Sequence, residues 1–521
     1  MKKVIIIGAG VAGLTCGIYA GINGFETEIY ELHAIPGGEC TGWDRKGYYF
    51  DGCIHWLVGS KEGTDLHKIW LDTGVLDDSV RIINHDVFSR YEEDGRAVNL
   101  YTDADKLEKH LLEIAPEDKK EIKNLVRAIK KMGNMGMPLE KPMDMMSAGD
   151  GLKFAAKNLG SFGLMMKYNK ITMGELAQKF KNPLLQRAIL ASMSDYYSSL
   201  SLVSTLAGMN SGDCGYPEGG SRPVAKRMEK RYLDLGGKVF YNARVEKILV
   251  EDGKAVGIRL TDGKEARADH IVSCADGYAT LYSMLEDKYT PETYRTLFGN
   301  PQKYPSITSA IVFMGVDAEI PYTFRAVDFK REKPVSLNGI TSECVSLLHY
   351  GYDKKITHDG KTVMACFYNA DYDYWKALYP DKEKYAAEKK KLEDDAVSEL
   401  VKRFPEAEGK IEVTDVVTPM TYEKYCNAWR GSWMTWVKPG KEVPQYFPGV
   451  LPGLENFIMA GMWTMPPGGL PGAAGAGRFA AHRLCVQNNL EFKTQTDVQA
   501  GPAQKKRSGH LPDAANGAGN G

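Results

Sequence analysis

The sequence predicts an α/β fold that begins with a strand, a helix and a second strand. Residues 4–7 (VIII) are continuously apolar, which is typical of a buried parallel strand. An uncharged segment rich in small residues follows at 11–22, and residues 26–30 predict the second strand. Three glycines in the pattern G-x-G-x-x-G separate the first strand from the helix: Gly8, Gly10 and Gly13. This order within one βαβ unit predicts a Rossmann-like dinucleotide-binding domain.

Each part of this unit has a physical role in dinucleotide binding. Gly8 permits the tight turn after the strand, and Gly10 lets the backbone approach a pyrophosphate. Gly13 lets the helix pack closely on the sheet, while free N–H groups at the helix N-terminus face the phosphates. Glu31 ends the second strand and can accept hydrogen bonds from ribose hydroxyls. The expected cofactor contacts of this unit are Gly8, Gly10, Val11, Ala12, Gly13 and Glu31.

A targeting segment is the alternative interpretation of this N-terminal stretch. Residues 4–22 carry no charge and follow Lys2 and Lys3, as in a signal peptide or a membrane anchor. The glycines at phosphate-loop spacing, and the charged strand directly after them, favour dinucleotide binding instead.

The composition predicts two intertwined domains in a reducing compartment. The chain of 521 residues exceeds one ordinary domain, and 43% hydrophobic with 26% charged residues is ordinary for a globular protein. A net charge of −1 gives no electrostatic basis for binding nucleic acid or an anionic membrane. The nine cysteines are scattered, so we expect no metal site and thiols that mostly fill core space. Since no second stretch is apolar enough to span a bilayer, we expect a cytoplasmic protein.

A second glycine-rich segment follows the acid expected to bind ribose. Gly37 and Gly38 indicate a second close approach of the backbone to the cofactor. Together, GAGVAG, Glu31, PGG and the FDG that follows resemble the flavin-containing amine oxidase superfamily, and within it the phytoene desaturase group. The resemblance covers most of residues 1–490 and implies that the cofactor is FAD. The chain departs from the bacterial desaturases at Glu39, where those enzymes usually carry Arg.

The resemblance places residues 53–57 (CIHWL) near the flavin ring, which makes His55 the candidate catalytic residue. Its unperturbed pKa lies near neutrality, so the imidazole could donate a proton beside a hydride-transferring flavin. The alternative is that His55 is a half-buried wall residue that only hydrogen-bonds the cofactor or the backbone.

Two further elements complete the expected cofactor site. The strand pattern at 238–250 contains V-x-x-I from Val245, whose backbone the resemblance places beside the adenine. A later strand at 457–460 leads into a Pro/Gly-rich turn and a helix starting near Pro471, a motif that resembles carotenoid isomerases and retinol saturases. In those relatives the helix N-terminus lies beneath the flavin pyrimidine edge, where it stabilises the negative charge of reduced flavin. The expected contacts here are Gly461, Met462, Gly469, Leu470, Pro471, Gly472 and Ala473.

The remaining segments predict an α+β substrate domain with a helical cap. Helical periodicity over 103–131 is followed by nine methionines from Met132 to Met173, which suit an adaptable apolar surface. An amphipathic pattern predicts a further helix over 381–404. They could cover an apolar tunnel and dip into lipid as a peripheral membrane contact, or they could form ordinary helical core. The expected ranges are 1–75, 205–290 and 410–493 for the FAD-binding domain, 76–204 and 291–409 for the substrate domain, and 494–521 for a disordered tail.

These expectations describe an FAD-dependent oxidoreductase that transfers hydride between the flavin and a C–C bond of a hydrophobic, polyene or isoprenoid-like small molecule. Desaturation, isomerisation and saturation share this machinery, and the residues do not decide among them. One alternative is a flavin amine oxidase-like enzyme, although the turn at 461–469 lacks the flavin-linking cysteine usual there. The other is a non-enzymatic prenyl-binding escort on the same fold, which the complete set of glycines argues against. The sequence does not indicate an oligomeric state.

Overall fold

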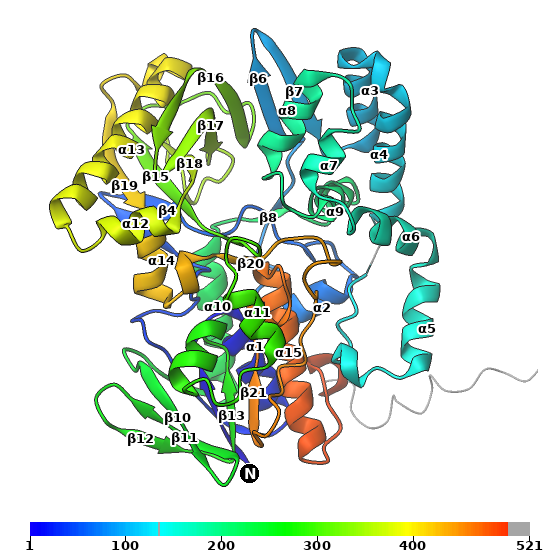
Figure 1. Cartoon of the computed structure of the whole chain (residues 1–521), viewed down its shortest axis with the longest axis vertical. Helices are drawn as coiled ribbons and strands as arrows, with labels where there is room; N and C mark the ends of the chain where they lie inside the picture. The colour runs from blue at the N-terminus through cyan, green and yellow to red at the C-terminus, as the bar shows by residue number, and fades with distance from the viewer. Residues whose placement is uncertain (134–135, 499–521) are drawn as a thin grey trace, which may run out of the picture.

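A five-stranded parallel sheet forms the centre of the lower half of the molecule in Figure 1. The computed structural model describes residues 1–133 and 136–498. The strands expected at 4–7, 26–30 and 457–460 are confirmed within one residue. In spatial order, the strands are β21 (Phe457–Met459), β13 (His270–Ser273), β1 (Lys3–Ile7), β2 (Glu26–Tyr30) and β9 (Lys238–Phe240).

Both faces of this sheet are buried, which explains why its first strand is apolar from Val4 to Ile7. Val4 and Ile6 pack in one core with helices α1 (Val11–Ile22), α10 (Ser221–Asp234) and α15 (Gly469–Gln487). Ile5 and Ile7 pack in a second core on the other face. That face is covered by the antiparallel sheet β10 (Val245–Glu251), β11 (Lys254–Leu260) and β12 (Glu265–Arg267), with the π-helical η3 (Ala279–Met284) and α11 (Glu292–Phe298).

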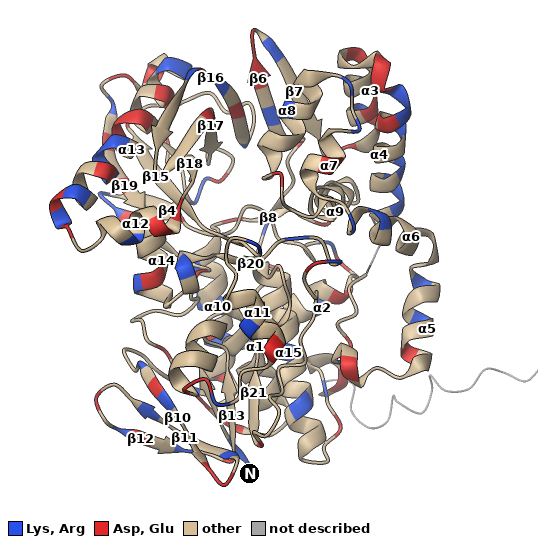
Figure 2. Cartoon of the chain, viewed as in Figure 1, with Lys and Arg blue, Asp and Glu red and all other residues tan. Residues whose placement is uncertain are grey.

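A seven-stranded mixed sheet forms the upper half of the molecule. Its strands pair in antiparallel fashion except for one parallel contact between β16 and β6. The helix expected over 381–404 is confirmed as α13 (Lys382–Arg403); it buries Leu392 and Leu400 and carries both signs of charge elsewhere (Figure 2). The strands in order are β19 (Ile411–Val417), β15 (Ser309–Val316), β18 (Thr362–Asn369), β17 (Ile340–His349), β16 (Ala326–Leu337), β6 (Val87–Glu93) and β7 (Arg96–Tyr101).

The helical cap is present and has its own core. Of its methionines, Met132 and Met173 are buried in that core, as an ordinary helical core predicts, whereas Met143 and Met166 are exposed. Contact of the exposed methionines with a tunnel or with lipid stays a prediction. Met135 lies outside the described residues. The helices are α3 (Ala104–Ile114), α4 (Lys119–Met132), α5 (Ala148–Lys157), α6 (Leu159–Tyr168), α7 (Met173–Ala177), α8 (Pro183–Ser192) and α9 (Ser199–Asn210).

Short elements join the two halves. The hairpin β3–β4 carries the chain from the second glycine segment toward the upper sheet, and the remaining elements are helices of three to eight residues and strands of two or three residues. These are β3 (Gly42–Arg45), β4 (Tyr48–Asp51), α2 (Asp65–Asp72), β5 (Ile82–Ile83), β8 (Tyr216–Pro217), β14 (Ser306–Ile307), α12 (Tyr372–Leu378), α14 (Pro419–Cys426), β20 (Met434–Trp436), η1 (Pro116–Asp118), η2 (Met143–Met145), η4 (Pro405–Ala407), η5 (Trp429–Gly431) and η6 (Met462–Thr464).

The domain boundaries differ from the expected ones at two places. Strand β19 (411–417) pairs with β15, so it belongs to the substrate sheet and not to the segment starting at 410. Helix α11 packs through Tyr294 and Phe298 into the core beneath the parallel sheet, so it belongs with the cofactor domain. Local hydrophobic patterns specify a strand or a helix but not which sheet it joins.

The C-terminal tail also differs in its first residues. Residues 494–498 include a helical turn in which the Asp497 carboxylate accepts from the Thr494 N–H at 3.0 Å. Gln495 Oε1 accepts from Arg231 Nη2 at 2.6 Å, which ties this turn to α10. The rest of the predicted tail, 499–521, lies outside the described residues.

The contact between α1 and α15 leads to a prediction about stability. A Cβ on Gly477 would lie 2.2 Å from the Ala12 carbonyl oxygen, so Gly477→Val must push the two helices apart. We expect a loss of about 1–3 kcal/mol or more and a melting temperature several degrees lower. The matched control is Gly163→Ala on α6, where nothing lies within 4 Å of the new Cβ. Equal melting temperatures for both variants in a thermal scan would contradict this account of the helix contact.

Candidate cofactor and active site

The loop between β1 and α1 has the geometry of a phosphate cradle. Gly8 has φ +97°, and a Cβ on Gly13 would lie 1.9 Å from the Gly8 carbonyl oxygen, so both positions require glycine. A Cβ on Gly10, in contrast, meets only the Gly37 carbonyl oxygen at 3.9 Å and otherwise open space. No side chain caps α1 and no acidic residue lies in its first turn, so the N–H groups at Val11 and Ala12 remain available to a phosphate.

Glu31 is held at the edge of this loop by two backbone donors. Its Oε2 accepts from the Ala9 N–H at 2.7 Å, and its Oε1 accepts from the His33 N–H at 2.8 Å. Burial raises the pKa of this carboxyl, and the backbone N–H groups oppose that rise. Each oxygen keeps a free lone pair, so the carboxylate can accept from ribose hydroxyls.

The second glycine segment lies directly against the first. The Gly37 N–H donates to the Ala9 carbonyl at 2.8 Å, and a Cβ on Gly38 would lie 3.4 Å from the Gly10 Cα. Val245 lies in the core beside β1 and β2, because the Ala243 N–H donates to the Glu31 carbonyl at 2.8 Å. The structure therefore brings together the three separated elements expected to hold the ADP half of the cofactor.

The C-terminal motif lies beside the β1–α1 loop, because it follows β21, the strand that pairs with β13. The Ala460 N–H donates to the Ser273 carbonyl at 2.8 Å, and the Gly461 Cβ position is 3.8 Å from the Cys274 carbonyl oxygen. Cys274 in turn packs against Gly8. Helix α15 begins two residues before Pro471, with no side-chain cap and no acid in its first turn. Its N-terminus contains the expected contacts Gly469, Leu470, Pro471, Gly472 and Ala473, with Met462 in the preceding η6.

Asp51 fixes the segment that carries His55. Its carboxylate accepts from the Tyr216 hydroxyl at 2.7 Å and from the Ser221 hydroxyl, while Ser221 Oγ accepts from the Ile54 N–H at 2.8 Å. This network joins β4 to the N-terminus of α10 and aims residues 54–56 at the substrate sheet. Sequence reasoning included Asp51 only as part of FDG and did not identify this role.

His55 is half-buried between the two domains. Its ring lies 5.7 Å from the Phe367 ring on β18 and 6.2 Å from the Trp56 ring. Burial, together with the positive charge of Arg325, lowers the pKa of His55 to about 3. The imidazole is therefore neutral at pH 7, because only about one in 10⁴ molecules carries the second proton.

Two carboxyls that sequence reasoning did not assign lie close to the cofactor elements. Burial and then the charge of Asp276 raise the pKa of Glu39 to about 8, so this side chain is largely protonated at neutral pH. Asp276 follows β13 and accepts from the Trp463 indole N–H at 2.9 Å and from the Trp429 N–H at 3.1 Å. The signal for Glu39 in the sequence is its position directly after the glycine pair.

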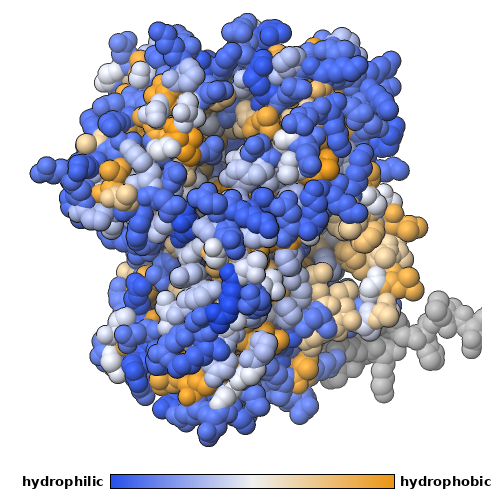
Figure 3. Space-filling model, viewed as in Figure 1, coloured by the Kyte–Doolittle hydropathy of each residue, from blue (hydrophilic) through white to orange (hydrophobic). Residues whose placement is uncertain are grey.

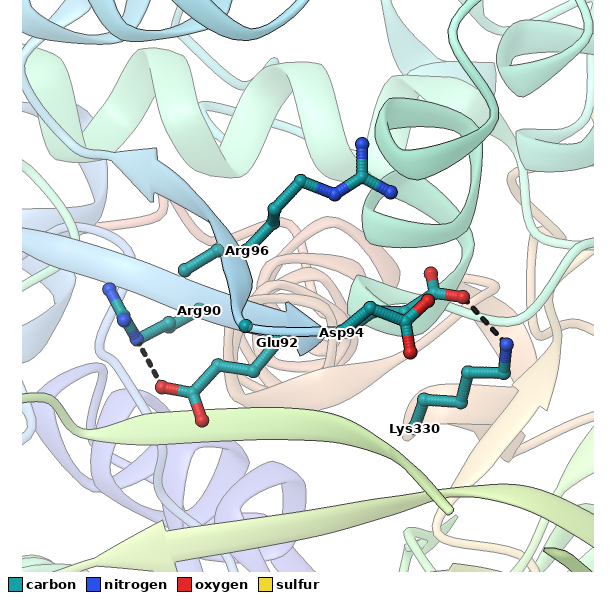
Figure 4. A pocket seen from close by; sticks show the side chains of 8 residues that line it. Arg90, Glu92, Asp94, Arg96 and Lys330 are labelled. Carbon is teal, nitrogen blue, oxygen red and sulfur yellow. Dashed lines mark hydrogen bonds and ion pairs between the residues drawn. The ribbon is translucent and has the colours of Figure 1, made fainter. Parts of the chain in front are cut away.

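Two surface pockets lie away from these elements. One, of about 290 Å³, is formed at the β6–β7 hairpin; in it Arg90 pairs with Glu92 at 2.6 Å and Lys330 pairs with Glu93 at 2.7 Å (Figure 4). The other, of about 350 Å³, is lined by residues from 319–322 and 351–362. Neither contains a glycine-loop residue. Within residues 1–133 and 136–498, no cluster of His, Cys, Asp and Glu has the arrangement of a metal site.

Comparison with known proteins matches this geometry. The sequence profile of the family described as flavin containing amine oxidoreductase matches residues 11–485. A prolycopene isomerase of an Oncidium hybrid cultivar is 24% identical over 94% of this chain and 84% of its own length. A neurosporene-forming phytoene desaturase of Rhodobacter capsulatus is 27% identical over 55% of each chain.

Solved structures share the fold at lower identity. An oxidoreductase from Methanosarcina mazei superposes with a TM-score of 0.55 at 18% identity, over 93% of this chain and all of the other. Cyclohexylamine oxidase from Brevibacterium oxydans gives a TM-score of 0.57 at 17% identity, over 94% and 99%.

The open space in front of Gly10, the two uncapped helix N-termini and the buried Glu31 fit a flavin dinucleotide. The chain belongs to the flavin-containing amine oxidoreductase family and is an FAD-dependent oxidoreductase.

Proposed function

We propose that this enzyme transfers hydride between FAD and a C–C bond of a long hydrophobic polyene or isoprenoid-like substrate. The observation that carries the proposal is similarity to prolycopene isomerases over nearly the whole chain, including the substrate sheet and the cap. The surroundings of residues 54–56 agree with it, because Trp56 packs edge-on against Phe88 at 5.5 Å and His55 faces Phe367. Aromatic walls of this kind suit a flat, apolar chain.

The chain's own residues would bind and orient the reactants. The ADP half is assigned to the β1–α1 loop, Glu31, the Gly37–Gly38 segment and Val245, and the flavin half to residues 461–473 at the N-terminus of α15. When bound, FAD supplies hydride exchange with carbon. The uncapped N-terminus of α15 would stabilise the negative charge that accompanies flavin reduction.

An amine substrate fits this site less well. The likeness to amine oxidase structures is a likeness of fold alone. The Arg325 guanidinium, which is 5% exposed, lies close enough to His55 to lower its pKa, and it would repel a cationic amine.

Incubation of the flavin-loaded protein with polyenes under anaerobic conditions tests the proposal and separates its three outcomes. With oxidised flavin, desaturation shifts polyene absorbance to longer wavelength and bleaches the flavin. With pre-reduced flavin, saturation shifts the polyene to shorter wavelength and restores flavin colour, whereas isomerisation changes the polyene with no net change in flavin. No change with phytoene, prolycopene or a polyene acid such as retinoic acid under either condition would overturn the proposal.

Gly10→Val tests the assignment of the ADP half. Because the new side chain would point into open space, we expect the apoprotein to melt at the wild-type temperature. The same side chain would fill the space of the pyrophosphate, so FAD content after reconstitution should fall on the order of tenfold or more. Released flavin is measured by absorbance after acid precipitation, with Gly163→Ala as the control. Normal FAD content in Gly10→Val would show that the pyrophosphate lies elsewhere.

The lowered pKa of His55 supports a wall or positioning role over proton donation. We expect His55→Gln to retain turnover within a few-fold, with flavin content unchanged. Between pH 5.5 and 8.5, we expect kcat to depend on pH in the same way in the wild type and in His55→Gln, because the imidazole titrates far below this range. If the imidazolium were the acid, kcat would decline above its pKa and His55→Gln would lose about 10²–10⁴-fold. That result would restore the catalytic assignment.

We further propose that the cap docks on a lipid surface through α5 and α6. No helix among the described residues is long and apolar enough to cross a bilayer. Leu152 is 72% exposed, Leu159 80% and Phe162 40%, and Figure 3 shows the resulting apolar surface at the right edge of the molecule. Lys153 and Lys157 lie on α5, and exposed apolar residues combined with basic ones are typical of interfacial helices.

Vesicle flotation tests the docking surface. We expect the protein to float with phosphatidylglycerol-containing vesicles, and the triple variant Leu152→Ser, Leu159→Ser, Phe162→Ser to lose most of that binding. The matched control is Leu233→Ser with Phe240→Ser, two exposed apolar residues on the cofactor domain. Flotation of the triple variant at the wild-type level, or none by the wild type, would refute docking through α5 and α6.

A further inference from the structure

Arg325, directly before β16, carries a buried charge that forms no ion pair within the described residues. The side chain is 5% exposed, and its Nη2 donates one hydrogen bond, to the Phe88 carbonyl at 3.2 Å. Its Nε is buried and has no partner. Across the part of the chain that the structure describes, no carboxylate forms an ion pair with this guanidinium. An unpaired buried cation is strongly unfavourable, so its retention calls for a ligand that supplies the missing charge.

The carboxylate of Asp328, three residues farther along the chain on β16, is already hydrogen-bonded. Asp328 is buried, and its Oδ2 accepts from the Ser89 hydroxyl at 2.9 Å. Burial raises the pKa of Asp328 to about 6, and Arg325 lowers it only as the last of several influences. Arg325 therefore acts on Asp328 only through space, because no hydrogen bond or ion pair joins the two groups in the described residues.

His85 provides a second buried donor without a partner. Its Nδ1 lies 3.2 Å from the Tyr322 hydroxyl, and its Nε2 is buried with no hydrogen-bond partner. When Tyr322 donates to Nδ1, the neutral imidazole carries its proton on Nε2, which is the unpaired atom. The ring is fixed edge-on against Tyr352, with 4.6 Å between centroids. Burial and the charge of Arg325 lower the pKa of His85 to about 3, so Arg325 carries the only full charge of the pair at neutral pH.

Two aromatic rings of the active-site wall lie beside the guanidinium, whose charge also acts on the phenols of Tyr322, Tyr350 and Tyr352. The Arg325 Cζ lies 5.7 Å from the Trp56 ring and 5.7 Å from the Phe88 ring. Trp56 follows His55, and Phe88 lies on β6 beneath the cap. A ligand at this place would meet Arg325 with a negatively charged group and the two aromatic rings with an apolar part.

We propose that Arg325 and His85 bind the carboxylate of the substrate, so that the substrate is a long apolar chain ending in an acid and not a pure hydrocarbon. This inference rests on the proposed function, because it names the substrate class of that same site. A guanidinium edge matches a planar carboxylate through paired N–H···O bonds. One guanidinium and one neutral imidazole balance a single negative charge, which suits a carboxylate better than a phosphate dianion.

Binding of three matched probes to the flavin-loaded protein tests the proposal without requiring turnover. The probes are retinoic acid, retinol and the corresponding hydrocarbon. Each is titrated into the protein, and the quenching of tryptophan fluorescence measures its binding. We expect the wild type to bind the acid about 10- to 100-fold more tightly than the alcohol. Arg325→Met should remove this preference and leave the affinity for alcohol and hydrocarbon within about threefold, while Arg325→Lys should restore part of it. His85→Phe should weaken acid binding, and His85→Gln, which keeps a donor, should weaken it less.

Folding and flavin content separate this role from a structural one. Because Arg325→Met removes an unpaired buried charge, we expect its melting temperature to equal or exceed that of the wild type, with unchanged FAD content and spectrum. Equal wild-type affinity for acid and alcohol would overturn the proposal, as would an equal loss for all three probes in Arg325→Met. If Arg325→Met changed the flavin spectrum but kept the preference for the acid, the guanidinium would contact the cofactor and not the substrate. Acid-selective binding combined with no redox change on any polyene would uphold the carboxylate site and refute the proposed reaction.

Discussion

The close packing of α1 on α15 is the contact on which the cofactor site depends. Gly477 on α15 faces the Ala12 carbonyl of α1, and Gly13 on α1 faces the Gly8 carbonyl, so no side chain separates backbone from backbone. This proximity brings two helix N-termini to one edge of the parallel sheet, and neither has a side-chain cap or an acid in its first turn. Two positive helix ends in one place favour a ligand with negative charge at both halves.

Burial sets the protonation states around that ligand. Glu31 remains a suitable acceptor because backbone N–H groups oppose the effect of burial, whereas Glu39, without such donors, is largely protonated at neutral pH. His55 and His85 are neutral because burial and Arg325 act in the same direction on both. The substrate side of the site is therefore apolar and aromatic, with its positive charge concentrated at one guanidinium.

The sequence predicted those parts of the molecule whose signals are local. The βαβ unit, the strand before the C-terminal helix and α13 follow their hydrophobic periods closely, and the glycines of both loops lie where a Cβ would clash or block a ligand. The partnership of β19 with the substrate sheet was not predictable, because pairing between residues 100 positions apart leaves no local pattern. Arg325 and Asp276 were missed for a related reason: each is a single polar residue beside a strand, and its importance comes from burial alone.

The strand order of the parallel sheet also constrains how the protein is made. The N-terminal strand β1 lies between β2 and β13, and β13 needs β21 as its outer neighbour. During synthesis, the glycine loop leaves the ribosome more than 400 residues before β21 (457–459) and α15 (469–487). Until then the apolar faces of β1 and α1 lack their final partners, and such surfaces favour aggregation. A complete flavin site therefore forms only when nearly the whole chain has been synthesised, which makes cofactor loading a late step of folding.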